Sequence, residues 1–146
     1  MSKTQLVITT RYLNLKDIPR VLDIDHQYTD PWDRELLLKN KRDKDIVCII
    51  AENSEVVVGF AIYDTSKGIN LLKFRVDESY TRLGVGGQLM DYIKKMARKR
   101  GRVIHVDINE RNLSGQLFLK SQGFTWIKTK HIKNDQDDLY LMVYSE

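Results

Sequence analysis

The stretch Leu71-Leu72-Lys73-Phe74-Arg75-Val76-Asp77 is followed by Glu78-Ser79-Tyr80-Thr81-Arg82-Leu83-Gly84-Val85-Gly86-Gly87 and then by residues 88–100. Apolar residues 72, 74 and 76 alternate with polar residues 73, 75 and 77, which predicts a strand with unlike faces. Residues 88–100 carry apolar side chains at helical spacing and end in a run of lysines and arginines, which suits the negative end of a helix dipole. The stretch is therefore predicted to be a strand, a glycine-rich turn and a helix.

The glycines of this turn favour a binding role. Gly84, Gly86 and Gly87 remove side chains where the helix begins, and Arg82 adds a cation beside them. The first amides of a helix lack partners within it and carry partial positive charge, so a phosphate can approach them closely. A tight turn that needs only positive φ angles is the alternative. The arginine and the strongly patterned helix favour the phosphate-binding interpretation.

Composition limits the class of protein. The chain has 146 residues, a net charge of +4 and a single cysteine, Cys48, within an apolar run. This length predicts one domain over residues 1–146, and nothing resembles a signal peptide or a membrane span of ~20 apolar residues. A buried, inert Cys48 thiol fits the cytoplasm. The basic residues are not interleaved with aromatic ones, so we do not expect nucleic acid as a partner. We also expect no membrane partner, and a chain that is a monomer or a homodimer.

Turn and breaker residues divide the chain into further elements. Strands are expected at residues 5–11, 45–51, 56–63, 71–77, 103–108, 124–130 and 139–144. Helices are expected from Asp17, from residues 30–33, over residues 88–100 and over residues 112–122. Gly59, inside a strand, indicates a bulge or a close approach of another backbone.

Two motifs resemble those of one family. Thr81-Arg82-Leu83-Gly84-Val85-Gly86 resembles motif A of the GCN5-related N-acetyltransferases, where Gln/Arg-x-x-Gly-x-Gly/Ala binds the pyrophosphate of acetyl-CoA, although Thr81 stands where Gln or Arg is usual. Residues 112–124 resemble the family's Asn-x-x-Ala-x-x-Leu-Tyr-x-x-x-Gly-Phe. The order of elements is also similar. Asp30-Pro31-Trp32 and the pattern of residues 74–86 look most like the ribosomal-protein alanine N-acetyltransferases, which modify a protein N-terminus.

The resemblance implies a fold and a reaction. The implied fold is α/β (α+β): one domain with a mixed, mostly antiparallel sheet of six to seven strands, splayed at the motif A strand and flanked by about four helices. The implied reaction moves the acetyl group from acetyl-CoA to a primary amine, such as a protein or peptide N-terminus, by direct attack in a ternary complex. The alternatives are a small-molecule amine acetyltransferase, acting on a polyamine or antibiotic-like amine, and a non-catalytic acyl-CoA-binding regulator.

The resemblance also implies which residues bind the cofactor. They are Phe74, Arg75, Val76, Thr81, Arg82, Leu83, Gly84, Val85, Gly86, Gly87 and Asn112. A backbone amide near Val76 would polarise the thioester carbonyl. For Asn112, the cap of a following helix is an equally good and compatible role.

Asp107 is the expected catalytic base, because it lies five residues before Asn112, where the alanine N-acetyltransferases carry a glutamate. His105 lies on the same strand face and is either a second candidate, as base or relay, or a structural residue. The family's acidic tyrosine corresponds to Leu119, which cannot donate a proton.

Aromatic side chains complete the expected site. Trp32 and Tyr140 are the candidates for substrate binding. Tyr80, Tyr140 and Tyr144 are other phenols that could serve as an acid, although core or rim positions are the simpler interpretation. No residues have the spacing of metal ligands.

Overall fold

The computed structural model describes residues 5–146, so residues 1–4 of the predicted domain lie outside the described residues. The described chain forms these elements in order: β1 (Thr9–Tyr12), η1 (Leu15–Asp17), α1 (Ile18–Asp25), α2 (Arg34–Arg42), β2 (Ile46–Asn53), β3 (Val56–Asp64), β4 (Ile69–Val76), η2 (Glu78–Tyr80), α3 (Val85–Lys99), β5 (Ile104–Asn109), α4 (Leu113–Ser121), β6 (Thr125–Lys130) and β7 (Leu139–Tyr144).

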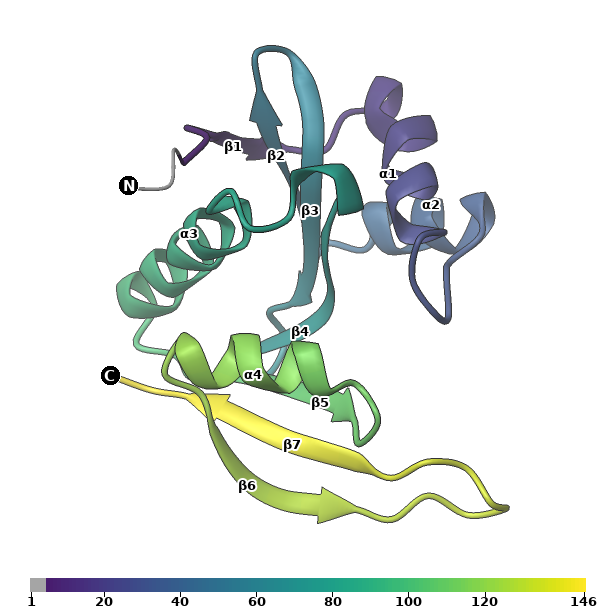
Figure 1. Ribbon diagram of the computed structural model, residues 1–146, viewed down its shortest axis with the longest axis vertical. Coiled ribbons are helices and arrows are strands. Elements are labelled where there is room, and N and C mark those ends of the chain that lie inside the picture. The colour runs from purple at the N-terminus through teal and green to yellow at the C-terminus, as the bar shows by residue number, and fades with distance from the viewer. Residues whose placement is uncertain (1–4) are drawn as a thin grey trace.

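One mixed sheet organises the chain. Its strand order is β1-β2-β3-β4-β5-β7-β6, and among these described strands only the β4–β5 pair is parallel. Helices α3 and α4 lie on one face, and α1 and α2 lie on the other (Figure 1). Each face has its own core, because the side chains of each strand alternate between the two faces. The predicted fold class is confirmed.

The sheet divides at its parallel pair. Strands β4 and β5 pair only at Ile69–Ile104, Asn70–His105 and Leu71–Val106. Beyond those pairs β4 remains hydrogen-bonded to β3, and β5 remains hydrogen-bonded to β7. Strands β5, β7 and β6 accordingly turn away from the rest of the sheet (Figure 1). We call this separation, between residues 73–76 of β4 and residues 107–109 of β5, the fork.

Two irregularities shape β4 next to the fork. Leu72 is an extra residue in the ladder, because Leu71 pairs with Tyr63 while Lys73 pairs with Ile62. The bulge interrupts the regular alternation that the sequence predicts for this strand. On the neighbouring strand, a Cβ at Gly59 would lie 2.9 Å from the carbonyl oxygen of Arg75. The close approach predicted at Gly59 is confirmed.

The first predicted strand is wrong in its extent. Residues 5–8 do not belong to β1, whose pairing with β2 begins at Thr9. The Leu6 amide instead donates to the carbonyl oxygen of Leu83 at 2.9 Å, and the Ile8 amide donates to Oε1 of Gln88 at 3.1 Å. These partners lie on the motif A turn and its helix. No local sequence pattern predicts hydrogen bonds between residues so far apart in the chain.

Two expectations from composition can be compared with the structure. Cys48 is buried, and burial raises the pKa of its thiol to about 11, so it stays protonated near neutral pH. No helix within residues 5–146 has the length and apolar character that crossing a membrane requires.

Candidate active site

The glycine-rich turn ends at the first turn of α3. Gly84 is the N-cap with a φ of 82°, a left-handed conformation that glycine adopts without strain. A Cβ at Gly86 would lie 3.2 Å from the Phe118 ring, whereas one at Gly87 would have only Nε2 of Gln122 nearby, at 3.9 Å. Gly86 therefore lets α4 pack closely, and Gly87 leaves the end of the helix open. The first amides of α3 are available for an anion.

Backbone groups of β4 face the fork. The Asp77 amide donates to Val58 of β3 at 2.8 Å. Hydrogen-bonding groups alternate between the two edges of a strand, so the Arg75 backbone also faces β3, and the Phe74 and Val76 backbones face the fork. Within residues 5–146, no strand pairs with them on that edge. Of the three predicted β4 positions, Phe74 and Val76 thus offer backbone groups at the fork.

Helix α4 covers the fork on the face of α3. Its Phe118 ring lies 5.3 Å from that of Phe74, measured between ring centroids. Leu119 is buried in the core, so the position of the family's tyrosine carries no acid here. Asn112 caps the helix, since its side-chain oxygen accepts from the Gly115 amide at 2.9 Å. The predicted capping role of Asn112 is confirmed, and its contact with a cofactor stays a prediction.

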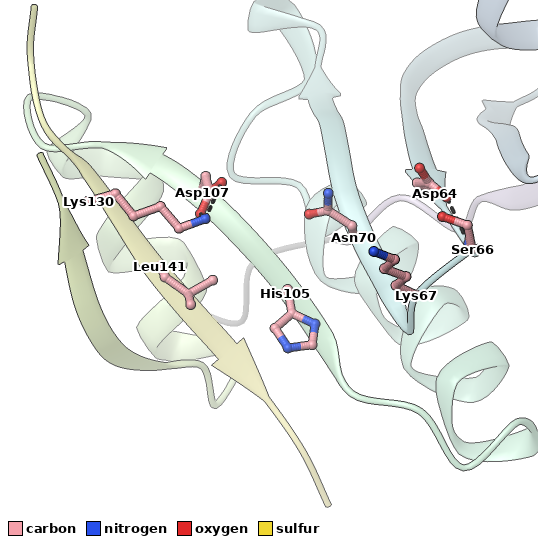
Figure 2. Close-up of a pocket in the computed structure, with 8 residues that line it drawn as sticks. All are labelled: Asp64, Ser66, Lys67, Asn70, His105, Asp107, Lys130 and Leu141. Carbon is pink, nitrogen blue, oxygen red and sulfur yellow. Dashed lines mark hydrogen bonds and ion pairs between the residues drawn. The ribbon is translucent and has the colours of Figure 1, made fainter. Parts of the chain in front are cut away.

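A pocket lies on the opposite face of the sheet. It has a volume of about 480 Å³, and its lining residues are Asp64, Ser66, Lys67, Asn70, His105, Asp107, Lys130 and Leu141. Figure 2 shows His105 and Asp107 side by side along β5 on this face. The structure therefore brings the two candidate bases into one pocket, as their spacing predicts.

The two candidates differ in their position relative to the fork. Asp107 is the first residue of β5 beyond the paired segment, whereas His105 pairs with Asn70 at the closed end. The Asp107 carboxylate binds Nζ of Lys130 at 2.9 and 3.0 Å, and its side chain is 36% exposed (Figure 2). Of the two candidates, Asp107 is thus the one beside the open part of the fork, and its carboxylate is paired with Lys130.

A buried charge cluster lies beside the fork and was missed by the sequence analysis. Asp25 and Lys73 are 3% and 5% exposed, and Nζ of Lys73 is 3.0 Å from both carboxylate oxygens. Arg75 adds a second cation, with Nε 3.3 Å from Asp25. Burial lowers the pKa of Lys73, while its bonds to Asp25 oppose that change. Asp25 and Lys73 are 48 residues apart, so no local sequence pattern predicts that they pair.

This cluster contains one of the two aromatic candidates. The Trp32 amide donates to Asp25 at 2.7 Å, and the Trp32 ring lies 5.1 Å from Nζ of Lys73. Tyr140 packs on the other face of the sheet, against the core under α3 and α4. The structure does not bring the two aromatic side chains together, and substrate binding by either stays a prediction.

Further contacts join α1 and the segment after it to the same strand. The Tyr28 hydroxyl donates to the Val76 carbonyl at the fork, and Arg20 pairs with Asp77. Burial raises the pKa of Tyr28, so its phenol stays protonated at neutral pH. Because this half of β4 pairs with β3 but not with β5, these contacts give it further support from the side of α1.

Comparison with known proteins identifies the family. The model of the acetyltransferase (GNAT) family matches residues 14–124. This chain belongs to that family. It is therefore an N-acetyltransferase whose cofactor is acetyl-CoA, as its motifs predict. Comparison with curated protein sequences gives no match.

Solved structures share the whole fold. The ribosomal-protein-S18-alanine N-acetyltransferase of Escherichia coli is 19% identical with a TM-score of 0.82, over 94% of this chain and 92% of that one. Ard1 from Thermoplasma volcanium is 24% identical with a TM-score of 0.84, over 95% and 97%. Arabidopsis thaliana NAA60 in complex with acetyl-CoA is 20% identical with a TM-score of 0.81, over 94% and 99%.

The residues of the site fit acetyl-CoA. The first turn of α3 lacks side chains at Gly86 and Gly87, so its amides can meet a pyrophosphate. The Phe74 and Val76 backbones at the fork can pair with amide groups of a pantetheine arm.

Proposed function

We propose that this enzyme acetylates the N-terminal amine of a protein or peptide by direct attack in a ternary complex. The observation that carries the proposal is the fork, which separates β4 from β5 beyond the Leu71–Val106 pair, with Asp107 of the adjoining pocket as the next residue of β5. The cofactor would approach on the side of α3 and α4, and the amine on the side of the pocket. The two reactants could then meet without crossing each other's path.

Acetyl-CoA, when bound, supplies an activated acetyl thioester. The amides of Val85, Gly86 and Gly87 would bind its pyrophosphate, and the backbone of Phe74 and Val76 would orient the arm that ends in the thioester. A backbone N–H at Val76 would stabilise negative charge on the thioester oxygen. Donors fixed in a strand need little rearrangement to do so.

Asp107 would act as the general base, directly or through a water molecule. Its carboxylate would take the proton that the amine loses as the nitrogen bonds to the acetyl carbon and the carbon–sulfur bond breaks. Leu119 offers no acid, and we propose that the sulfur is protonated from solvent. His105 would support the pocket wall, since it lies at the closed end of the fork.

The ion pair of Lys130 with Asp107 supports a proposed position for the acceptor. The Lys130 ammonium contacts Asp107 at 2.9 Å, and the neutral acceptor amine would take its place there, with one N–H directed at the carboxylate. This ion pair is partly exposed, and such pairs are worth about 0–1 kcal/mol, so an incoming amine can replace Lys130 at little cost.

An N-terminal amine is the proposed acceptor class. The structural relatives include an enzyme named for alanine acetylation of a ribosomal protein, and NAA60 has been solved with a bisubstrate analogue. A peptide acceptor and the buried thiol of Cys48 fit the cytoplasm, which we propose as its location. A small cationic amine is the second candidate, because the pocket holds the carboxylates of Asp64 and Asp107.

Product analysis separates these candidates. The enzyme would be incubated with acetyl-CoA and, in turn, a lysine-containing peptide with a free N-terminus, the same peptide with a blocked N-terminus, and spermidine. We expect one acetyl group on the free N-terminus only, located by tandem mass spectrometry. Transfer to spermidine alone would replace the proposed acceptor with a polyamine. Binding of acetyl-CoA without transfer to any amine would indicate a regulator.

A further inference from the structure

The segment of residues 5–8 forms a short arm that lies against the motif A turn. The Leu6 amide donates to Leu83, and the Ile8 amide donates to Gln88. Nε2 of Gln88 in turn donates to the carbonyl oxygens of Leu6 and Gly84. The arm is thus attached both to the turn and to the first turn of α3, so its position depends on the residues that form the cofactor site.

The side chain of Gln5 lies directly on Gly84. A Cβ at Gly84 would be 2.9 Å from Cδ and 3.2 Å from Nε2 of Gln5. The Gln5 side chain is exposed, and within residues 5–146 its carboxamide has no hydrogen-bond partner. A free amide donor therefore stands at the N-cap of α3, beside the amides that would receive the pyrophosphate.

Thr81 does not supply a donor at this place. The family motif has glutamine or arginine at the position of Thr81, and here the Thr81 hydroxyl donates to the Glu78 carbonyl at 3.1 Å. That bond directs the short side chain back toward η2. At the position of Thr81 the turn lacks the long polar side chain of the motif, although Arg82 follows it, while Gln5 brings one from another part of the chain.

We infer that Gln5 binds a phosphate oxygen of acetyl-CoA and replaces the contact that Thr81 lacks. The carboxamide N–H would donate to the anionic oxygen, and a hydrogen bond to a charged acceptor is stronger than one between neutral groups. The bonds of Gln88 hold the arm in position beforehand, which reduces the entropy lost on binding. This inference rests on the cofactor site of the proposed function and does not depend on the acceptor.

Calorimetric titration with acetyl-CoA tests the inference. We expect Gln5→Ala to weaken binding about tenfold, and Gln5→Glu to weaken it further because its carboxylate would repel the phosphate. Val7→Ala is the matched control on the same arm: the Val7 side chain is 80% exposed, and that variant should bind as the wild type does. Adding Thr81→Gln to Gln5→Ala should restore most of the lost affinity, which a merely structural role of Gln5 would not allow.

Three results would overturn the inference in distinguishable ways. Equal or tighter binding by Gln5→Ala would mean that Gln5 only covers Gly84. Weaker binding that Thr81→Gln fails to restore would mean that Gln5 acts by supporting the turn. Absence of acetyl-CoA binding in the wild type would remove the cofactor site of the proposed function itself.

Discussion

Replacing Asp107 with asparagine is the sharpest test of the proposed chemistry. General-base catalysis contributes about 10²–10⁴ in rate. Because the Asp107 side chain is 36% exposed, water can partly take over its role, and we expect the lower end of that range. The predicted loss is therefore about 100-fold in kcat/KM, which corresponds to about 2.7 kcal/mol of activation free energy. The assay would follow release of the coenzyme A thiol, with peptide acetylation checked by mass spectrometry.

Two further variants make this result specific. Lys130→Met removes the partner of Asp107 without touching the carboxylate, and it should lower the KM for the acceptor up to about fivefold, since an exposed ion pair is worth at most about 1 kcal/mol. His105→Gln tests the other candidate and should change kcat/KM less than about threefold, because His105 lies at the closed end of the fork. Activity of Asp107→Asn within threefold of the wild type, or a larger loss in His105→Gln, would refute this reasoning.

Two predictions concern the charges that hold the fold. Asp25→Asn leaves the Lys73 ammonium buried without its counter-charge, so the free energy of unfolding, measured by urea denaturation, should fall by about 3–5 kcal/mol. Adding Lys73→Met should recover much of that loss. Equal stability of Asp25→Asn and the wild type would contradict the buried pair. The hydrogen bond from Arg11 lowers the pKa of Asp17 below 3.8, so its contribution to stability is present above that pH and is lost as the pH falls through the lower folded-state pKa. Asp17→Asn should therefore lower the free energy of unfolding at pH 7. It should also make that free energy fall less steeply with decreasing pH, as measured by urea unfolding at pH 7 and at a series of acidic pH values. A pH dependence unchanged from that of the wild type would count against the Arg11 contact.

The sequence predicted the motif A region well because its signals are local. Glycine spacing at Gly84, Gly86 and Gly87, and helical periodicity after them, both depend on neighbours in the chain. The Asn112 cap and the shared face of His105 and Asp107 follow equally from short-range geometry. These features needed no knowledge of which strands lie side by side.

The contacts around the fork could not be found in this way. The alternation at Lys73 and Arg75 suggested a polar face, yet Lys73 is buried against α1 because Asp25 supplies its counter-charge. The bulge at Leu72 depends on pairing with β3, and the arm at Gln5 depends on the distant turn before α3. Each feature arises from groups that are far apart in sequence, and only the fold brings them together.

The most direct test of the central claim is acetyl-CoA binding to Gly87→Glu, with Gly87→Gln as the control of equal size. A side chain fits at Gly87, where only Gln122 is near, whereas at Gly86 it would clash with Phe118. A carboxylate about 6 Å from two phosphate charges, at an effective dielectric constant of about 40, costs about 3 kcal/mol. We predict that calorimetry shows binding by the wild type, about 100-fold weaker binding by Gly87→Glu, and a small loss in Gly87→Gln. Equal affinity in all three proteins, or no binding by the wild type, would contradict a cofactor site at the start of α3.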